Sequence, residues 1–271
     1  MKEFAINLKR MRKEKQMTQK QLAQALGISP QAVSKWERGE CETEMDMTAR
    51  IAGIFNVDVN FLLGYSNDHG THYEEKYRRK GFYWGYKVND LAYEVLKLMP
   101  PTRPLRLLDI GCGEGQAAVF FARNGYQVSA FDIAETGIQK GRKLAEAAGV
   151  HVDFLCADML SHELEGTYDI IYSTDVLEYV PQEDRERVLL QLKEHTETDG
   201  INVLDVFVEK PFIETAPDWE HGKEHYWKTG ELFSHYHDWK IELLMEPVFD
   251  CMSAGIYHRH CMDKMIARKM G

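Results

Sequence analysis

Three closely spaced glycines near the middle of the chain could bring backbone close to a ligand. Residues 105–110 form an apolar run that predicts a buried strand, and Gly111, Gly113 and Gly115 follow it directly. A helix is predicted next, over residues 116–124. A strand, a glycine loop and a helix in this order create a ligand-binding loop at the carboxyl end of a sheet.

Acidic and hydroxyl side chains follow the later predicted strands. Asp132 ends the strand predicted over residues 127–131 and could accept hydrogen bonds from both hydroxyls of a ribose, although an exposed helix cap is the alternative. Asp158 follows the strand at 152–155, and Ser173 and Thr174 end the strand at 168–174. A helix over residues 184–195 and a strand over 201–208 complete five strand–helix steps. This alternation predicts an α/β fold with a parallel sheet and right-handed crossovers.

The glycine spacing, G-x-G-x-G preceded by Asp109, resembles the first motif of class I S-adenosylmethionine-dependent methyltransferases. The nearest competitor, an NAD-dependent dehydrogenase, usually carries G-x-G-x-x-G instead. The resemblance implies a Rossmann-like, seven-stranded methyltransferase sheet and S-adenosylmethionine as cofactor. It places Asp158 at the adenine amino group, Met159 against the adenine ring, and Ser173 and Thr174 beside the methionine part. The full set of cofactor residues it implies is Asp109, Gly111, Gly113, Gly115, Asp132, Ile133, Asp158, Met159, Ser173 and Thr174.

The C-terminal part from residue 105 to residue 269 resembles the tellurite-resistance methyltransferases, through runs such as HYWKTGELFSHYHDW (225–239) and MIARK (265–269). This resemblance implies a small soft nucleophile as methyl acceptor, such as tellurite, selenite or a thiol. It also makes His258, Arg259 and His260 candidate catalytic residues. On a strand the two histidines would share one face and Arg259 would take the other, but a solvated sheet edge is an equal alternative. A metal held by the histidines is not expected, because the sequence fixes no third ligand.

DNA is not the expected methyl acceptor. The fourth strand ends in STDV and lacks the Asn/Asp-Pro-Pro-aromatic motif of amino-methylating DNA enzymes, and there is no Pro-Cys nucleophile. The charge agrees, since the chain beyond residue 66 carries a net charge of −12 while residues 1–66 carry +2. A polyanion would be attracted to the first part and repelled by the second.

The first 66 residues predict a helical domain with two helices joined by a tight turn. Thr18 and Gln21 form a capping-box pattern, Gly27 ends that helix, and Ser29 with Pro30 begins the next one. The run TQKQLAQALGISPQAVSKWERGE resembles the phage-repressor-like helix-turn-helix family, which places the second helix in the major groove. The DNA contacts implied are Gln19, Gln31, Ser34, Lys35 and Arg38, and a homodimer is implied as well; a domain that binds only protein is the alternative.

The expected organisation is therefore a helix-turn-helix domain over residues 1–66 and a methyltransferase domain over 105–271. Residues 67–104 between them form a linker and an aromatic-rich helical segment that either covers the cofactor or packs on the core. With no signal peptide or apolar run long enough to span a membrane, and with scattered cysteines, a cytoplasmic location is expected. Two functions fit: a small-molecule methyltransferase with a DNA-binding regulatory domain, or a transcriptional regulator that senses S-adenosylmethionine or a metalloid.

Overall fold

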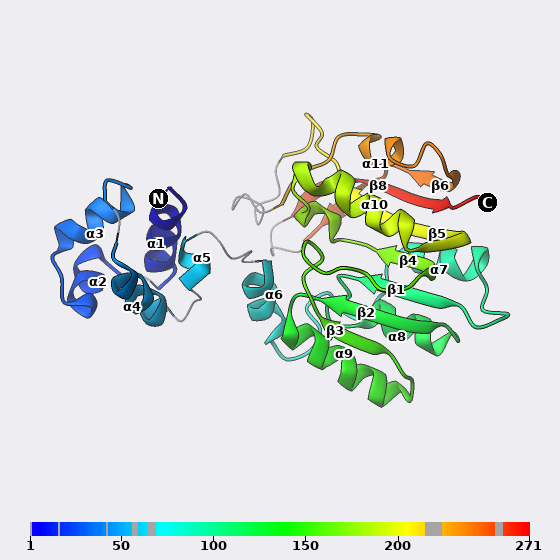
Figure 1. The fold of residues 1–271 in the computed structure, drawn as a ribbon, viewed down its shortest axis with the longest axis horizontal. Helices are drawn as coiled ribbons and strands as arrows, with labels where there is room; N and C mark the ends of the chain where they lie inside the picture. The colour runs from blue at the N-terminus through cyan, green and yellow to red at the C-terminus, as the bar shows by residue number, and fades with distance from the viewer. Residues whose placement is uncertain are drawn as a thin grey trace. The chain divides into compact units, whose positions relative to one another are not determined.

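The computed structural model describes residues 2–15, 17–41, 43–55, 59–63, 69–214, 224–252 and 257–271. The chain divides into two compact units, Met1–Asp68 and His69–Gly271, which Figure 1 colours blue to cyan and cyan to red. In the part of the chain that the structure describes, no helix combines the length and the apolar character that crossing a bilayer requires.

The first unit consists of short helices around one apolar core. Their bounds are α1 Lys2–Glu14, α2 Gln19–Leu26, α3 Pro30–Glu37, α4 Met45–Phe55 and α5 Val59–Leu63. The predicted caps are present: the backbone N–H of Gln21 donates to Thr18 Oγ1, and Thr18 N–H donates back to the Gln21 side chain. Gly27 ends α2 at a φ of +71°, and Pro30 opens α3 after the Ser29 cap. These local signals fix the turn between α2 and α3.

The second unit is built on one mixed sheet, with strand order β3-β2-β1-β4-β5-β8-β6 and with β7 paired to β8. The first five strands are parallel, and β8 is antiparallel to its neighbours. The strand bounds are β1 Arg106–Ile110, β2 Gln127–Asp132, β3 Asp153–Cys156, β4 Tyr168–Ser173, β5 Thr196–Phe207, β6 Lys240–Met245, β7 Val248–Cys251 and β8 His258–Arg268.

Eight strands are present where seven were expected, because one edge strand is in two pieces. Both β6 and β7 pair with β8, at Met245↔Lys264 and Val248↔Cys261. Pro247 lies between them; it has no N–H to donate, although its carbonyl still accepts from Met262 N–H at 3.1 Å. The sheet therefore has seven strand positions, as predicted.

Helices cover both faces of this sheet, and alternate residues of each strand point to opposite cores (Figure 1). Leu107 packs with the core under α7, α8 and α9, whereas Leu108 packs with the core under α10 and α11. The helix bounds are α6 His69–Tyr77, α7 Asp90–Leu98, α8 Gln116–Arg123, α9 Glu135–Ala148, α10 Arg185–Glu194 and α11 Glu231–Ser234, with 3-10 turns η1 Leu177–Tyr179 and η2 Gln182–Asp184.

Candidate functional site

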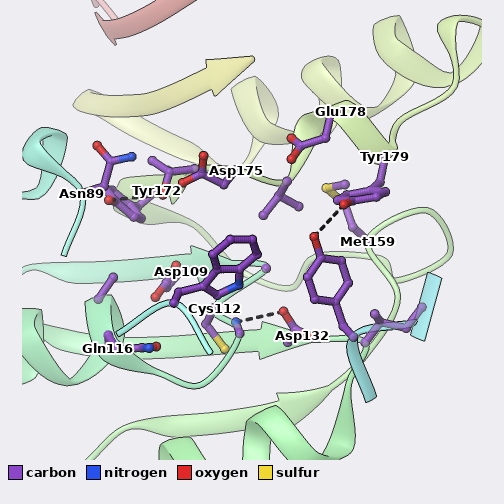
Figure 2. Close-up of a pocket in the computed structure, with 18 of the residues that line it drawn as sticks. Asn89, Asp109, Cys112, Gln116, Asp132, Met159, Tyr172, Asp175, Glu178 and Tyr179 are labelled. Carbon is purple, nitrogen blue, oxygen red and sulfur yellow. Dashed lines mark hydrogen bonds between the residues drawn. The ribbon is translucent and has the colours of Figure 1, made fainter. Parts of the chain in front are cut away.

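A cavity of about 400 Å³ lies at the carboxyl ends of β1, β2 and β4 (Figure 2). Of the predicted cofactor residues, those that line it are Asp109, Gly111, Gly113, Asp132, Ile133, Asp158, Met159 and Thr174. Its volume is within the range of roughly 300–1,000 Å³ that small-molecule sites occupy. The topology explains its position, since ligands of open α/β sheets bind where the strand order reverses, here between β1 and β4.

The glycine loop after β1 must be glycine for steric reasons. Gly111 has a φ of +68°, and a Cβ there would lie 2.2 Å from a methyl of Val176. Gly113 has a φ of +54°, and a Cβ there would lie 2.9 Å from the Tyr77 hydroxyl. Gly115 has a different role from the one predicted: it does not line the cavity, and its Cα packs against Gly141 on α9. The first two glycines shape the cavity, and the third brings α8 and α9 together.

Asp132 holds the glycine loop through its side chain. One carboxylate oxygen accepts from Gly113 N–H at 2.9 Å, a bond drawn in Figure 2, and the other accepts from Ala134 N–H at 2.8 Å. Burial raises the pKa of the Asp132 carboxyl to about 6, against the effect of these two bonds. Each carboxylate oxygen has a second lone pair, so the group can accept further hydrogen bonds from a ligand.

Asp109, at the end of β1, is a second buried acid at the same loop. Burial and the neighbouring charge of Asp132 raise the pKa of its carboxyl to about 7. Its Oδ2 atom is buried and has no hydrogen-bond partner among the described residues. Carboxyls with such raised pKa values in a cavity are typical of functional sites.

The side of the cavity formed after β3 and β4 brings together most of the residues predicted there. Asp158 and Met159 line it, and the Asp158 carboxylate accepts from Leu160 N–H at 2.9 Å. Thr174 lines it too, whereas Ser173 is completely buried in the sheet and does not. Strand alternation explains the difference, because adjacent residues of a strand point to opposite faces.

The aromatic segment before α7 covers the cavity. Tyr73, Tyr77 and Trp84 line it, and the Tyr73 hydroxyl bonds the Tyr179 hydroxyl at 2.6 Å (Figure 2). The residue that fastens the segment, Glu114, was missed from the sequence. Its buried carboxylate accepts from Tyr83 N–H at 2.6 Å and pairs with Lys140 Nζ at 2.7 Å. Its position between two loop glycines is the signal that could have identified it.

Glu178, which follows β4 in the sequence, is a further buried acid in the cavity. It is 3% exposed, and its Oε2 atom has no hydrogen-bond partner among the described residues. Burial and the neighbouring Asp175 charge raise the pKa of Glu178 well above its usual value. A neutral carboxyl in this position can donate a hydrogen bond to a ligand.

The candidate catalytic residues on β8 are separated by strand alternation. His258 and His260 share one face and their Nε2 atoms lie 2.9 Å apart, but only His260 lines the cavity. His258 is buried behind it. Arg259 is exposed and faces away from the cavity, so it does not reach a bound ligand in this arrangement.

The helix α3 and the Arg38 that caps its C-terminus present four of the five side chains predicted to contact DNA. Gln31, Lys35 and Arg38 are exposed, and Ser34 is half-buried beside them. Arg38 makes two bonds to the Glu40 carboxylate, at 2.5 and 2.9 Å, and also contacts the Ser34 hydroxyl. Gln19, the remaining predicted contact, is the first residue of α2.

The Gln19 side chain is held by a largely buried ion pair between Arg12 of α1 and Glu37 of α3. Its amide donates to the Glu37 carboxylate at 2.8 Å, and Arg12 makes two bonds to the same carboxylate, at 2.5 and 2.9 Å. The hydrogen bonds from Arg12 and Gln19 lower the pKa of Glu37, although burial opposes them. The pair ties α1, α2 and α3 together and fixes the orientation of the Gln19 amide.

Comparison with known families identifies both units. A methyltransferase domain family matches residues 107–200, and a helix-turn-helix family matches residues 8–62. The chain joins a helix-turn-helix domain to a methyltransferase domain. The methyltransferase domain is 26% identical over 174 residues to the probable S-adenosyl-L-methionine-dependent methyltransferase TehB of Haemophilus influenzae. It is 25% identical over 165 residues to a ubiquinone biosynthesis O-methyltransferase of Rickettsia conorii.

These similarities cover parts of each protein. The TehB alignment covers 61% of this chain and 57% of the relative, so the chain spans little more than half the length of the curated relatives it matches. The crystal structure of Haemophilus influenzae TehB superposes with a TM-score of 0.61 at 20% identity, covering 74% of this chain and 67% of that one. The structure of magnesium protoporphyrin IX methyltransferase from Synechocystis, solved with S-adenosylhomocysteine, superposes with a TM-score of 0.54 at 17% identity. This match covers 76% of this chain and 96% of that one. The structural matches establish the fold of the methyltransferase domain.

Proposed function

We propose that the methyltransferase domain binds S-adenosylmethionine in the cavity and transfers its methyl group to a small soft nucleophile, such as tellurite, selenite or a thiol. The observation that carries this proposal is the pairing of Asp132 with the glycine loop, since its carboxylate holds Gly113 and lines the cavity. The resemblance to TehB, a probable S-adenosyl-L-methionine-dependent methyltransferase, supports the same donor.

The predicted contacts would give the donor one orientation in the cavity. Its ribose hydroxyls would donate to Asp132, and its adenine would lie between Ile133 and Met159 with its amino group at Asp158. Its methionine part would then lie along Gly111 and the residues after β4, with Thr174 beside it. In this orientation the sulfonium and its methyl group face the part of the cavity lined by Glu178 and His260.

The size and cover of the cavity favour a small acceptor. At about 400 Å³ the cavity is near the lower end of the range for ligand sites, and donor and acceptor would have to share it. The aromatic segment, fastened by Glu114 and Lys140, covers the donor. Methyl transfer needs chiefly in-line positioning of the nucleophile and exclusion of water, and a covered cavity provides both.

The test is product formation by the purified full-length chain. We expect S-adenosylhomocysteine to be released when S-adenosylmethionine is supplied with tellurite, selenite or a small thiol, and not without an acceptor. Calorimetry with S-adenosylmethionine alone separates donor binding from turnover. Donor binding without turnover on any of these acceptors contradicts the acceptor class and favours a domain that only senses the donor.

We also propose that the helix-turn-helix domain binds double-stranded DNA through α3, as a homodimer. The exposed row of Gln31, Lys35 and Arg38 supports this, because amide and cationic groups on one helical face can contact base edges and phosphates. A DNA sequence selected from a random library, followed by fluorescence anisotropy, tests it. If added S-adenosylmethionine changes the affinity of the selected DNA, the two domains form a regulator as well as an enzyme.

A further inference from the structure

A cysteine and two histidines meet at the end of the cavity formed by β7 and β8. The Cys251 thiol and one imidazole nitrogen from each of His258 and His260 lie within 4.8 Å of one another. Cys251 and His260 also line the cavity, so this cluster opens into the space assigned to the methyl acceptor.

The strand register explains why these three residues meet. Cys251 lies directly opposite His258 in the antiparallel pair of β7 and β8, and His260 is two residues further along β8. Directly opposed residues, and residues two apart on one strand, point to the same face of a sheet. The sequence could not show this, because it does not reveal which residue of β7 lies opposite the histidines.

The arrangement is that of a set of metal ligands. The two Nε2 atoms share a hydrogen bond at 2.9 Å, and the three ligand atoms, one from each residue, lie within 4.8 Å of one another, so a cation could replace the shared proton between them. Both imidazoles are buried, and the rings of Phe207 and Phe249 contact His260 with centroids at 4.8 and 5.7 Å. Apolar rings around a ligand limit the access of water and strengthen binding of a cation.

We propose that Cys251, His258 and His260 bind Zn²⁺ with one coordination position open toward the cavity. One thiolate and two imidazoles form a borderline-soft ligand set that suits zinc and excludes magnesium or calcium, which prefer oxygen. Ligand atoms around tetrahedral zinc lie roughly 3.3–3.8 Å apart, so small side-chain rotations convert the observed cluster into such a site. Three protein ligands with an open fourth position are typical of catalytic zinc rather than structural zinc.

The open coordination position of the zinc indicates which class of methyl acceptor binds there. This assignment rests on the methyl transfer proposed above. A thiol that binds the zinc loses its proton to water and stays bound as a thiolate. Its sulfur then forms the new bond to the methyl carbon, while the carbon–sulfonium bond breaks and leaves its electron pair on the donor sulfur. The products are a thioether and S-adenosylhomocysteine, and the zinc keeps its charge throughout. The acceptor is therefore a small thiol.

The metal site is tested by titrating the full-length, metal-free chain with Co²⁺, whose spectrum reports thiolate ligation and tetrahedral geometry. We expect one ion per chain, a thiolate-to-cobalt band, and displacement by Zn²⁺. Cys251→Ser should remove the band and lower zinc affinity by more than the roughly 10–100-fold that loss of an outer-sphere partner costs. Cys41→Ser, at an exposed cysteine of the other unit, is the matched control and should change neither.

Different results of these experiments would overturn the metal site, the thiol acceptor and the proposed methyl transfer. Absence of the band in the wild-type chain, or a band that persists in Cys251→Ser, overturns the metal site. His260→Gln provides a second ligand variant, and circular dichroism shows whether each variant is folded. Adding 2-mercaptoethanol to the cobalt protein should intensify the thiolate band, and an unchanged band overturns the thiol acceptor while leaving the metal site standing. Binding of S-adenosylmethionine, measured by calorimetry, tests the donor site of the proposed function independently of the metal site and of the thiol acceptor.

Discussion

The exposed face of α3 and the cavity of the methyltransferase domain differ in how their side chains are brought together. The α3 residues come from one helix of eight residues and lie on its exposed face. The cavity takes residues from many elements between Tyr73 and His260, and three of its six acids, Asp109, Asp132 and Glu178, are buried. A site on one helix follows from helical periodicity alone, whereas a cavity depends on how distant segments pack.

The charged side chains of α3 and those of the cavity also differ in their exposure to solvent. On the surface, Arg38 pairs with Glu40 while both remain about half exposed. In the cavity, burial raises the pKa of Asp109 to about 7 and that of Asp132 to about 6. Removing one partner of the exposed pair should therefore change little. The charge of a buried acid, by contrast, is stable only when hydrogen bonds or a ligand stabilise it.

Asp132→Asn should lower the affinity for S-adenosylmethionine by about 100-fold, because two hydrogen bonds from ribose to a charged acceptor are weakened. Isothermal calorimetry measures the affinity. The exposed Glu135→Gln, in the first turn of α9, is the matched control and should bind normally. DNA affinity should stay unchanged in both variants, and a parallel loss of DNA binding would contradict two independent modules.

Lys35→Ala should reduce affinity for the selected DNA by roughly 10-fold, because one contact from the exposed face of α3 is lost. Anisotropy measures this, and the methylation rate should not change. Lys15→Ala removes the same charge outside α3 and serves as the control. An equal effect of the two substitutions would mean that only net charge matters.

Lowering the pH from 7 to 5 should weaken S-adenosylmethionine binding by about 10-fold. The raised pKa of Asp132, about 6, means that its carboxylate is ionised above pH 6 and protonated below, where it accepts hydrogen bonds less well. The fall should be absent in Asp132→Asn. A fall that persists there would assign the effect to Asp109, whose pKa is about 7.

Glu40→Gln should have the smallest effect and increase DNA affinity by about 2- to 5-fold. It weakens a surface ion pair that holds Arg38, which is then available for a phosphate. Affinity measured at several salt concentrations should also become more salt-dependent. An unchanged affinity and salt dependence would show that Arg38 makes no phosphate contact.

Much of the fold was predictable from local patterns. The caps at Thr18 and Gly27 and the order of strands and helices follow from residue types and spacing. The break at Pro247 was not predicted, although proline commonly interrupts a strand. Of the predicted cofactor residues, Gly115 and Ser173 lie outside the cavity. Periodicity places a residue on an element, but packing decides whether its side chain faces a ligand or the interior.

The sequence by itself determined the two domains, the glycine loop, and the alternation that separates Arg259 from the two histidines. These features depend on contacts within one or two elements, and local geometry fixes them. Only the tertiary structure decided that Glu114 fastens the aromatic segment, and that Cys251 lies opposite His258. Both depend on register and packing between segments far apart in the chain, which no local pattern specifies.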